Sequence, residues 1–187
     1  ETLTAQMGKK TFRPLDRSKV RTYPLKKRFS KVHQSLLGKK LQKGVQIRSF
    51  IRGLPDILAA QNLKEIARRV ARAHRNDKTI LLGMGAHPIK VGLSPLLIDF
   101  MERGIISALA MNGAGIIHDF EIAFMGETSE DVAASLKDGS FGMAEETGAF
   151  LNRAIVKGYD RGQGIGAAAG EAILKAHLPH HRLSILA

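Results

Sequence analysis

The chain contains no cysteine and no tryptophan among its 187 residues, and aromatic residues make up only 5% of it. The missing cysteines exclude disulfides, thiolate metal sites and a cysteine nucleophile, and they fit a reducing compartment. No apolar run approaches the length of a membrane span, and no signal peptide is visible at the start. We therefore expect a cytoplasmic protein with no membrane partner.

Acidic residues are scarce at the beginning of the chain. Residues 1–50 hold 14 lysines and arginines against only Glu1 and Asp16, whereas the remaining residues hold 15 cations and 15 anions. The net charge of +12 therefore belongs to the first 50 residues. This asymmetry predicts a basic N-terminal arm at residues 1–50 and a neutral α/β domain at residues 51–187.

The basic arm allows two interpretations. Clustered cations release the counterions of phosphates, so the arm is a candidate to bind RNA or an acidic partner. Alternatively, it is an extended arm that wraps a neighbouring subunit. We favour the second interpretation at this point, because Phe12, Tyr23 and Phe29 are few for a base-stacking platform.

Hydrophobic periodicity predicts alternating strands and helices after residue 55. Two short apolar runs predict parallel strands that are buried on both faces, with a helix between them, which is a strand–helix–strand unit. Asn62 and Glu65 have the spacing of a helix cap and its reciprocal partner. The predicted elements are helices at residues 62–74, 94–103, 116–125, 128–138 and 143–158, strands at residues 79–84, 105–111 and 182–187, and a loop at residues 85–92.

This alternation predicts an α/β fold with a Rossmann-like, doubly wound parallel sheet. Three strands are few for an independent sheet of that kind. We therefore expect the sheet to be partial, either because the chain is truncated at its C-terminal end or because another chain completes it.

A glycine-rich turn follows the second predicted strand. Asn112, Gly113, Ala114 and Gly115 have small side chains, so a ligand can approach their backbone closely, and the helix that begins there favours an anionic group. Open α/β sheets bind nucleotides at this place. The third glycine of the dinucleotide fingerprint is replaced by His118, so a tight connection without a ligand is the alternative.

Residues 85–115 together resemble deoxyhypusine synthase, and the resemblance extends over residues 55–125. In that family a polar loop follows the first strand, and a Thr-Thr-Ala-Gly-Gly turn with a Val-Glu-Glu-Asp stretch follows the second. Gly115 and Asp119 match this pattern. Asn112 replaces a threonine, and Ile117 and His118 stand where the family has glutamates.

The resemblance implies an NAD-binding enzyme and homotetramers with sites at subunit interfaces. The enzyme would transfer an aminoalkyl group from a polyamine such as spermidine, through an imine, to an amine acceptor. The family's imine-forming lysine lies in a Gly-Gly-Gly-x-Pro-Lys segment that these residues do not contain, so the catalytic residues are unknown. The implied cofactor residues are Gly85, Ala86, His87, Asn112, Gly113, Ala114, Gly115, His118 and Asp119.

Two other function assignments remain open. One is a non-catalytic binding or scaffold protein on the same fold, whose basic arm contacts RNA or an acidic partner, and the other is an enzyme for a different nucleotide. Glu145 and Glu146 are candidates for binding a cationic amine, although acids are also common in the first turn of a helix. His177, His180 and His181 lack a carboxylate at ligand spacing, so we expect no metal there. The glycine pattern at residues 162–166 follows no strand, so we do not expect a phosphate loop there. We expect Gly166, Ala167 and Gly170 instead to let a helix pack closely against a neighbour.

Overall fold

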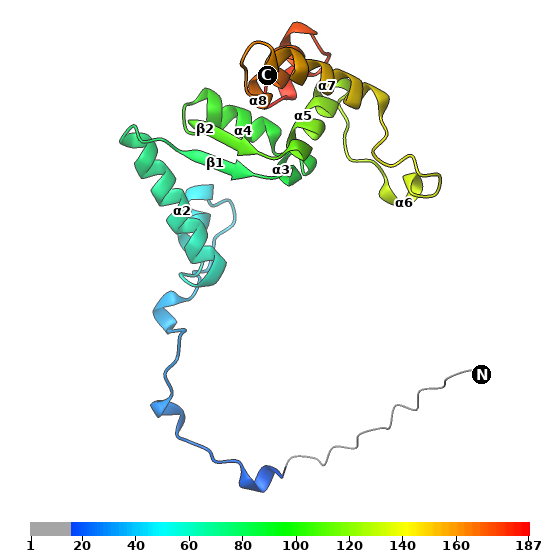
Figure 1. Ribbon diagram of the computed structural model, residues 1–187. Coiled ribbons are helices and arrows are strands. Elements are labelled where there is room, and N and C mark those ends of the chain that lie inside the picture. The colour runs from blue at the N-terminus through cyan, green and yellow to red at the C-terminus, as the bar shows by residue number, and fades with distance from the viewer. Residues whose placement is uncertain (1–15) are drawn as a thin grey trace, which may run out of the picture. The chain divides into compact units, whose positions relative to one another are not determined.

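The computed structural model describes residues 16–187 (Figure 1). The chain divides into two compact units, Glu1–Asn62 and Leu63–Ala187. The arm residues Lys9, Lys10, Phe12 and Arg13 lie outside the described residues. Within residues 16–187, no helix is both long and apolar enough to cross a membrane.

Between residues 16 and 46, the first unit has little regular structure. It contains the short 3-10 turns η1 (Arg17–Lys19), η2 (Leu25–Lys27) and η3 (Gln34–Leu36), followed by the helix α1 (Ile47–Gly53). Its described side chains up to residue 50 are exposed, except the partly buried Leu36. Backbone bonds from Lys39 N to Gly53 O (2.8 Å) and from Asp56 N to Leu36 O (2.9 Å) tie the end of this segment together.

A long helix, α2 (Leu58–Arg75), begins four residues earlier than predicted. Asn62 lies inside it, so the predicted cap at Asn62 is wrong. The apolar spacing that indicated the helix already begins at Leu58, and the helix continues through Ala59 and Ala60, which favour helix as strongly as any residue.

The second unit contains the predicted strand–helix–strand unit. β1 (Leu81–Met84) and β2 (Ala108–Met111) pair in parallel, and α4 (Ser94–Glu102) lies between them in the sequence. The predicted loop at residues 85–92 contains one helical turn, α3 (His87–Lys90). The fold is therefore α/β, with a parallel two-stranded sheet (Figure 1).

The sequence predicted strands that are buried on both faces, and this prediction is wrong. In β1, the exposed residues Leu81 and Gly83 alternate with half-buried ones. In β2, the exposed residues Ala108 and Ala110 alternate with half-buried ones in the same way. Because the register pairs Leu81 with Ala108 and Gly83 with Ala110, the exposed residues share one face of the sheet. Apolar composition alone does not reveal that one face lacks a covering layer in this unit.

The predicted strand at residues 182–187 is also wrong. A 3-10 turn, η4 (His181–Leu183), occupies its start. Beyond it, the amides of Ile185, Leu186 and Ala187 donate to side-chain oxygens rather than to a neighbouring strand. Burial of Ile185 and partial burial of Leu186 account for the apolar pattern without a strand.

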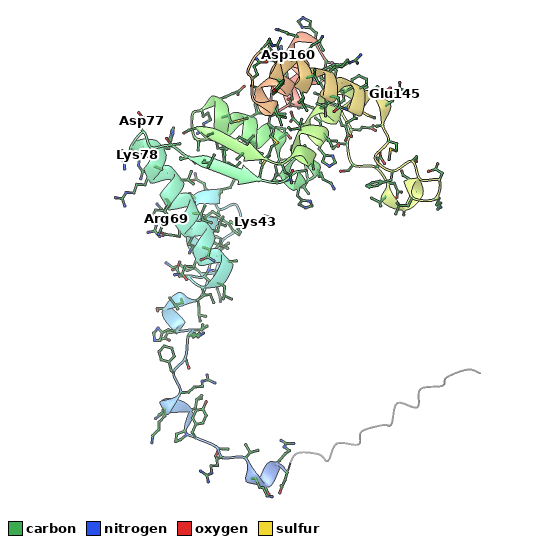
Figure 2. All side chains as sticks on the ribbon, viewed as in Figure 1. Lys43, Arg69, Asp77, Lys78, Glu145 and Asp160 are labelled. Atoms are coloured by element: carbon green, nitrogen blue, oxygen red, sulfur yellow. The ribbon has the colours of Figure 1, made fainter. Side chains whose placement is uncertain are left out.

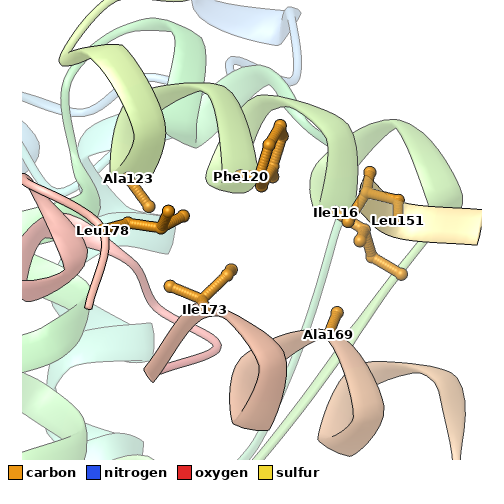
Figure 3. Close-up of a cluster of buried hydrophobic side chains, with 7 residues drawn as sticks. All are labelled: Ile116, Phe120, Ala123, Leu151, Ala169, Ile173 and Leu178. Carbon is orange, nitrogen blue, oxygen red and sulfur yellow. The ribbon is translucent and has the colours of Figure 1, made fainter. Parts of the chain in front are cut away.

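Four helices follow β2, and three of them enclose the core. They are α5 (Gly113–Met125), α6 (Val132–Ser135), α7 (Glu145–Tyr159) and α8 (Ile165–Lys175). Figure 3 shows the buried cluster between α5, α7, α8 and the segment after α8. Its members are Ile116, Phe120, Ala123, Leu151, Ala169, Ile173 and Leu178.

Helix α5 has defined signals at both ends. The Asn112 side chain accepts a hydrogen bond from Gly115 N at 3.2 Å and so caps its start. Gly126 ends the helix with φ +79°, a left-handed conformation that favours glycine. In the middle of the helix, the Phe120 ring stacks on Phe150 of α7 at a centroid distance of 4.6 Å. This helix therefore links the turn after β2 to the core.

Close packing around α8 depends on missing side chains at Gly158 and Gly170. The prediction from the glycine pattern is confirmed for Gly170 but not for Gly166, whose Cβ would meet only the Leu186 side chain at 3.8 Å. A Cβ on Gly158 would overlap the Ala168 methyl group. A Cβ on Gly170 would overlap the backbone carbonyl of Leu186. Because a backbone carbonyl cannot rotate away as a side chain can, Gly170 lets α8 pass directly against the C-terminal segment.

We expect Gly170→Ala to lower the free energy of unfolding by about 1–3 kcal/mol, since the new methyl group overpacks this contact. Gly166→Ala in the same helix is the matched control, because its Cβ would meet only the Leu186 side chain at 3.8 Å. The control should leave the stability unchanged or raise it by up to about 1 kcal/mol. Urea unfolding followed by circular dichroism measures both, and equal stability of the two variants would contradict the packing argument.

Candidate nucleotide pocket

A cavity of about 900 Å³ opens within the second unit, beside the glycine turn. Its walls come from β2, the first half of α5, the segment before α7, the helices α7 and α8, and the C-terminal residues Ile185 and Leu186. Apolar side chains dominate, among them Leu109, Ile116 and Ile155, and the lining includes no lysine or arginine. Size and apolar lining are those of a pocket for an organic ligand.

Gly113 lines this cavity, and its backbone has no side chain to cover it. It is the first residue of α5, it lines the cavity, and a Cβ on it would meet no atom within 4 Å. The first amides of a helix have no partner within the helix, and they lie at the positive end of its dipole. Asn112 caps the amide of Gly115, so the backbone of Gly113 is the part of this turn that lines the cavity.

The loop after β1 lies next to this turn but does not line the cavity. A Cβ on Gly85 would lie 3.8 Å from Asn112 Nδ2, so the two predicted cofactor segments are neighbours. Ala86 and His87 belong to the start of α3, which packs against α5. Of the nine predicted cofactor residues, the structure places only Gly113 in the cavity lining.

Of two other predicted positions of the turn, Gly115 serves packing and Ala114 is exposed. Gly115 is buried, and a Cβ on it would overlap the Met111 side chain. Ala114 lies beside it in the first turn of α5. Close approach of α5 to the end of β2 therefore explains one of the two turn glycines, and the opening to the cavity explains the other.

The carboxylate of Asp119 is fully buried, with 0% exposure. Its oxygens accept hydrogen bonds from Ser184 Oγ (2.6 Å), Ile185 N (2.8 Å) and Leu186 N (3.3 Å). Contact with a cofactor ribose requires an accessible carboxylate, and in this arrangement Asp119 instead holds the C-terminal segment to α5. Ser184 Oγ extends the network by accepting from Leu186 N and Ala187 N.

Burial raises the pKa of the Asp119 carboxyl above its usual value, while the hydrogen bonds from Ser184, Ile185 and Leu186 act in the opposite direction. A protonated Asp119 still has a partner, because its hydroxyl can donate to Ser184 Oγ while the other oxygen accepts from Ile185 N. The network therefore suits a neutral carboxyl as well as a charged one.

Glu121 is a cavity residue that the sequence analysis missed. It lines the cavity, and Thr128 Oγ1 donates to its Oε2 while Thr147 Oγ1 lies 3.5 Å from its Oε1. His118 Nδ1 lies 2.6 Å from Thr128 Oγ1 and 3.4 Å from Glu121 Oε2. His118 thus joins a histidine–threonine–glutamate cluster at the cavity wall. The signal that could have found Glu121 is its spacing of three residues from His118, which puts both on one helix face.

The predicted amine-binding pair does not face this cavity. Glu145 and Glu146 form the first turn of α7. Glu146 lines a smaller neighbouring cavity of about 230 Å³, which it shares with Glu121. The second acid in the main cavity is Glu130, whose Oε2 accepts from Gly142 N at 3.0 Å. Glu121 and Glu130, rather than Glu145 and Glu146, are therefore the acids that line the main cavity.

Two of the histidines near the C-terminus form hydrogen bonds within the protein. His180 N donates to Ala123 O at 2.9 Å, and His181 Nδ1 lies 2.9 Å from Leu178 O. In the described part of the chain, no three histidine, aspartate or glutamate side chains gather as metal ligands would.

No family model matches the chain, and no curated protein matches it at a significant level. We therefore argue its function from the residues and the geometry of the cavity.

We expect Asp119→Ala to lower the free energy of unfolding by about 2–4 kcal/mol, because the buried amide of Ile185 loses its acceptor. Asp99→Ala is the control, since the half-exposed Asp99 carboxylate pairs with Arg103 at the surface, and it should cost less than about 1 kcal/mol. Urea unfolding at neutral pH checks both values.

The pH dependence tests the direction of the Asp119 pKa. A raised folded pKa means that its stabilisation is complete below the unfolded value of about 3.9 and is lost as the pH rises through the folded pKa. The stability of the wild type relative to Asp119→Asn should therefore fall as the pH rises above about 4. A relative stability that instead grows with pH would mean that the hydrogen bonds outweigh burial.

Proposed function

We propose that the cavity beside Gly113 binds NAD and that the protein is an NAD-dependent aminoalkyl transferase of the deoxyhypusine synthase type. The observation that supports this most is the open backbone of Gly113 at the start of α5, at the edge of a cavity of about 900 Å³. The position matches the place where open α/β sheets bind dinucleotides, after the carboxyl end of a parallel strand. We also propose that β1 and β2 are part of a Rossmann-like, doubly wound sheet.

The lining fits the parts of a dinucleotide. Leu109, Ile116 and Ile155 offer apolar surface for flat rings, and the amides at the start of α5 suit the pyrophosphate. With no lysine or arginine in the lining, the pyrophosphate depends on these amides and on the helix dipole. Since Asp119 is buried, the hydroxyls of a ribose would find their polar partners in Asn152 and Glu130 instead.

Two carboxylates give the cavity a preference for a cation. Glu121 and Glu130 both line it, and no basic side chain in the lining compensates them. An amine substrate such as spermidine carries the opposite charge and an apolar chain, which match the acids and the apolar walls. The hydrogen bonds from Thr128 and Thr147 to its two oxygens fix the orientation of the Glu121 carboxylate.

When bound, NAD supplies a hydride acceptor for oxidation of the amine. Glu121 would hold the ammonium group and accept its proton, with Thr128 and His118 beside it as a path for that proton. No lysine lines the cavity, so none of its residues is a candidate for the covalent imine of the family. The resemblance also implies a homo-oligomer, which belongs to the proposal.

Calorimetric titration with NAD tests the cofactor site. We expect the wild type to bind and Gly113→Val to weaken binding at least about tenfold, because the new side chain fills the place of the pyrophosphate and its Cβ meets no protein atom within 4 Å. Gly83→Val is the matched control, since its Cβ also meets no atom within 4 Å and Gly83 is not a lining residue. Equal weakening in both variants, or no binding by the wild type, would contradict the proposed site.

The amine site is tested separately with spermidine in the presence of NAD. Glu121→Gln keeps the shape of the side chain but removes its charge, so spermidine binding should weaken at least about tenfold while NAD binding is retained. Glu102→Gln, on the exposed surface of α4, should leave both unchanged. Unchanged spermidine binding in Glu121→Gln would remove Glu121 from the proposed mechanism.

A further inference from the structure

The described part of the basic arm carries almost exclusively positive charge. Residues 16–50 contain 11 lysines and arginines and one acidic residue, Asp16. Asp16 is itself engaged, because it accepts from Ser18 N at 3.0 Å and pairs with Lys19 at 3.7 Å. The other cations of the segment have no carboxylate within it to neutralise them. A segment of this kind attracts a polyanion.

The cations are displayed along an exposed chain. Figure 2 shows the side chains of this segment, with Lys43 labelled, and all its described lysines and arginines are exposed. Near its end, a hollow of about 320 Å³ is lined by Lys39, Lys40 and Arg52 together with polar groups of Gln42 and Ser49. Donors of this kind around a hollow suit a phosphate group.

Of the three aromatic residues between positions 16 and 53, two have rings that are more exposed than that of Phe50. Tyr23 is 65% exposed and Phe29 is 90% exposed, and each has basic neighbours in the sequence. Neither ring is held in a core, so both faces of Phe29 are open to a planar partner. Nucleic-acid bases stack on exposed aromatic rings with little regard for sequence.

We propose that residues 16–53 form a binding segment for single-stranded RNA, in which the cations contact phosphates and Tyr23 and Phe29 stack on bases. This role is independent of the NAD cavity. The composition alone favoured a subunit-wrapping arm, but the second unit of another copy is a poor electrostatic partner, since residues 63–187 contain 14 cations and 14 anions. A membrane surface is also less suited, because the segment before α1 is not an amphipathic helix and its backbone amides need water or a polar ligand.

The experiment is fluorescence anisotropy of a labelled oligouridylate titrated with the full chain over a series of salt concentrations. Binding should weaken steeply with salt, with a slope that reports the number of phosphates contacted. The variant Lys26→Ala, Lys27→Ala, Arg28→Ala should bind at least about tenfold more weakly at 0.1 M salt and should lower the slope by about 2. The variant Lys90→Ala, Lys137→Ala, Lys157→Ala removes three exposed cations outside the segment and should bind like the wild type.

A second pair of substitutions separates base stacking from charge. Tyr23→Leu with Phe29→Leu keeps apolar side chains but removes the rings, and it should weaken binding about fivefold or more without changing the salt slope. Polyglutamate of matched length serves as the competitor. Displacement of the RNA by polyglutamate at equal charge concentration would overturn the proposal in favour of an acidic protein partner. Absence of RNA binding, together with self-association that the Lys26/Lys27/Arg28 variant abolishes, would overturn it in favour of a second copy.

Discussion

The buried carboxylate of Asp119 is the interaction on which the second unit depends. Its three hydrogen bonds join the middle of α5 to residues 184–186, which are 65 to 67 positions away in the sequence. Ile185 and Leu186 in turn form one wall of the cavity, and α8 packs on the same segment through Gly170. Without this network, the C-terminal residues would have neither a strand partner nor an acceptor for their amides, and the cavity would lose a wall.

Helix α5 therefore has three roles in the second unit. Its first turn presents Gly113 to the cavity, its second carries Asp119, and its apolar face supplies Ile116, Phe120 and Ala123 to the core. The core contacts hold the helix from one side, and the Asn112 cap fixes where it begins. A ligand at the first turn thus meets backbone groups that are already ordered, which lowers the entropic cost of binding.

Local signals in the sequence predicted the helices and strands of this unit better than they predicted the burial and the tertiary contacts of individual residues. Strand, helix and glycine turn between residues 79 and 125 follow from neighbouring residues, and the structure has both strands, α4 and α5 there. The burial of Asp119 does not follow from such signals, because its partners lie more than 60 residues away. Residues 182–187 were predicted as a strand because their apolar pattern indicates burial. In the structure, the side-chain oxygens of Asp119 and Ser184 accept the hydrogen bonds that a neighbouring strand would otherwise accept. Glu121 was missed because only the fold brings Thr128 and Thr147 to it.

The two proposed binding regions use different electrostatics. The cavity lining holds two acids and no basic side chain, so an anionic group there depends on backbone amides and a helix dipole within a largely apolar enclosure. Residues 16–50 instead offer exposed side-chain cations that ions in solution screen. A phosphate held by fixed amides releases few counterions, whereas a strand held by many cations releases one for each phosphate that it engages. Salt therefore distinguishes the two regions within one chain: it should act weakly on a ligand of the cavity and strongly on a ligand of the arm.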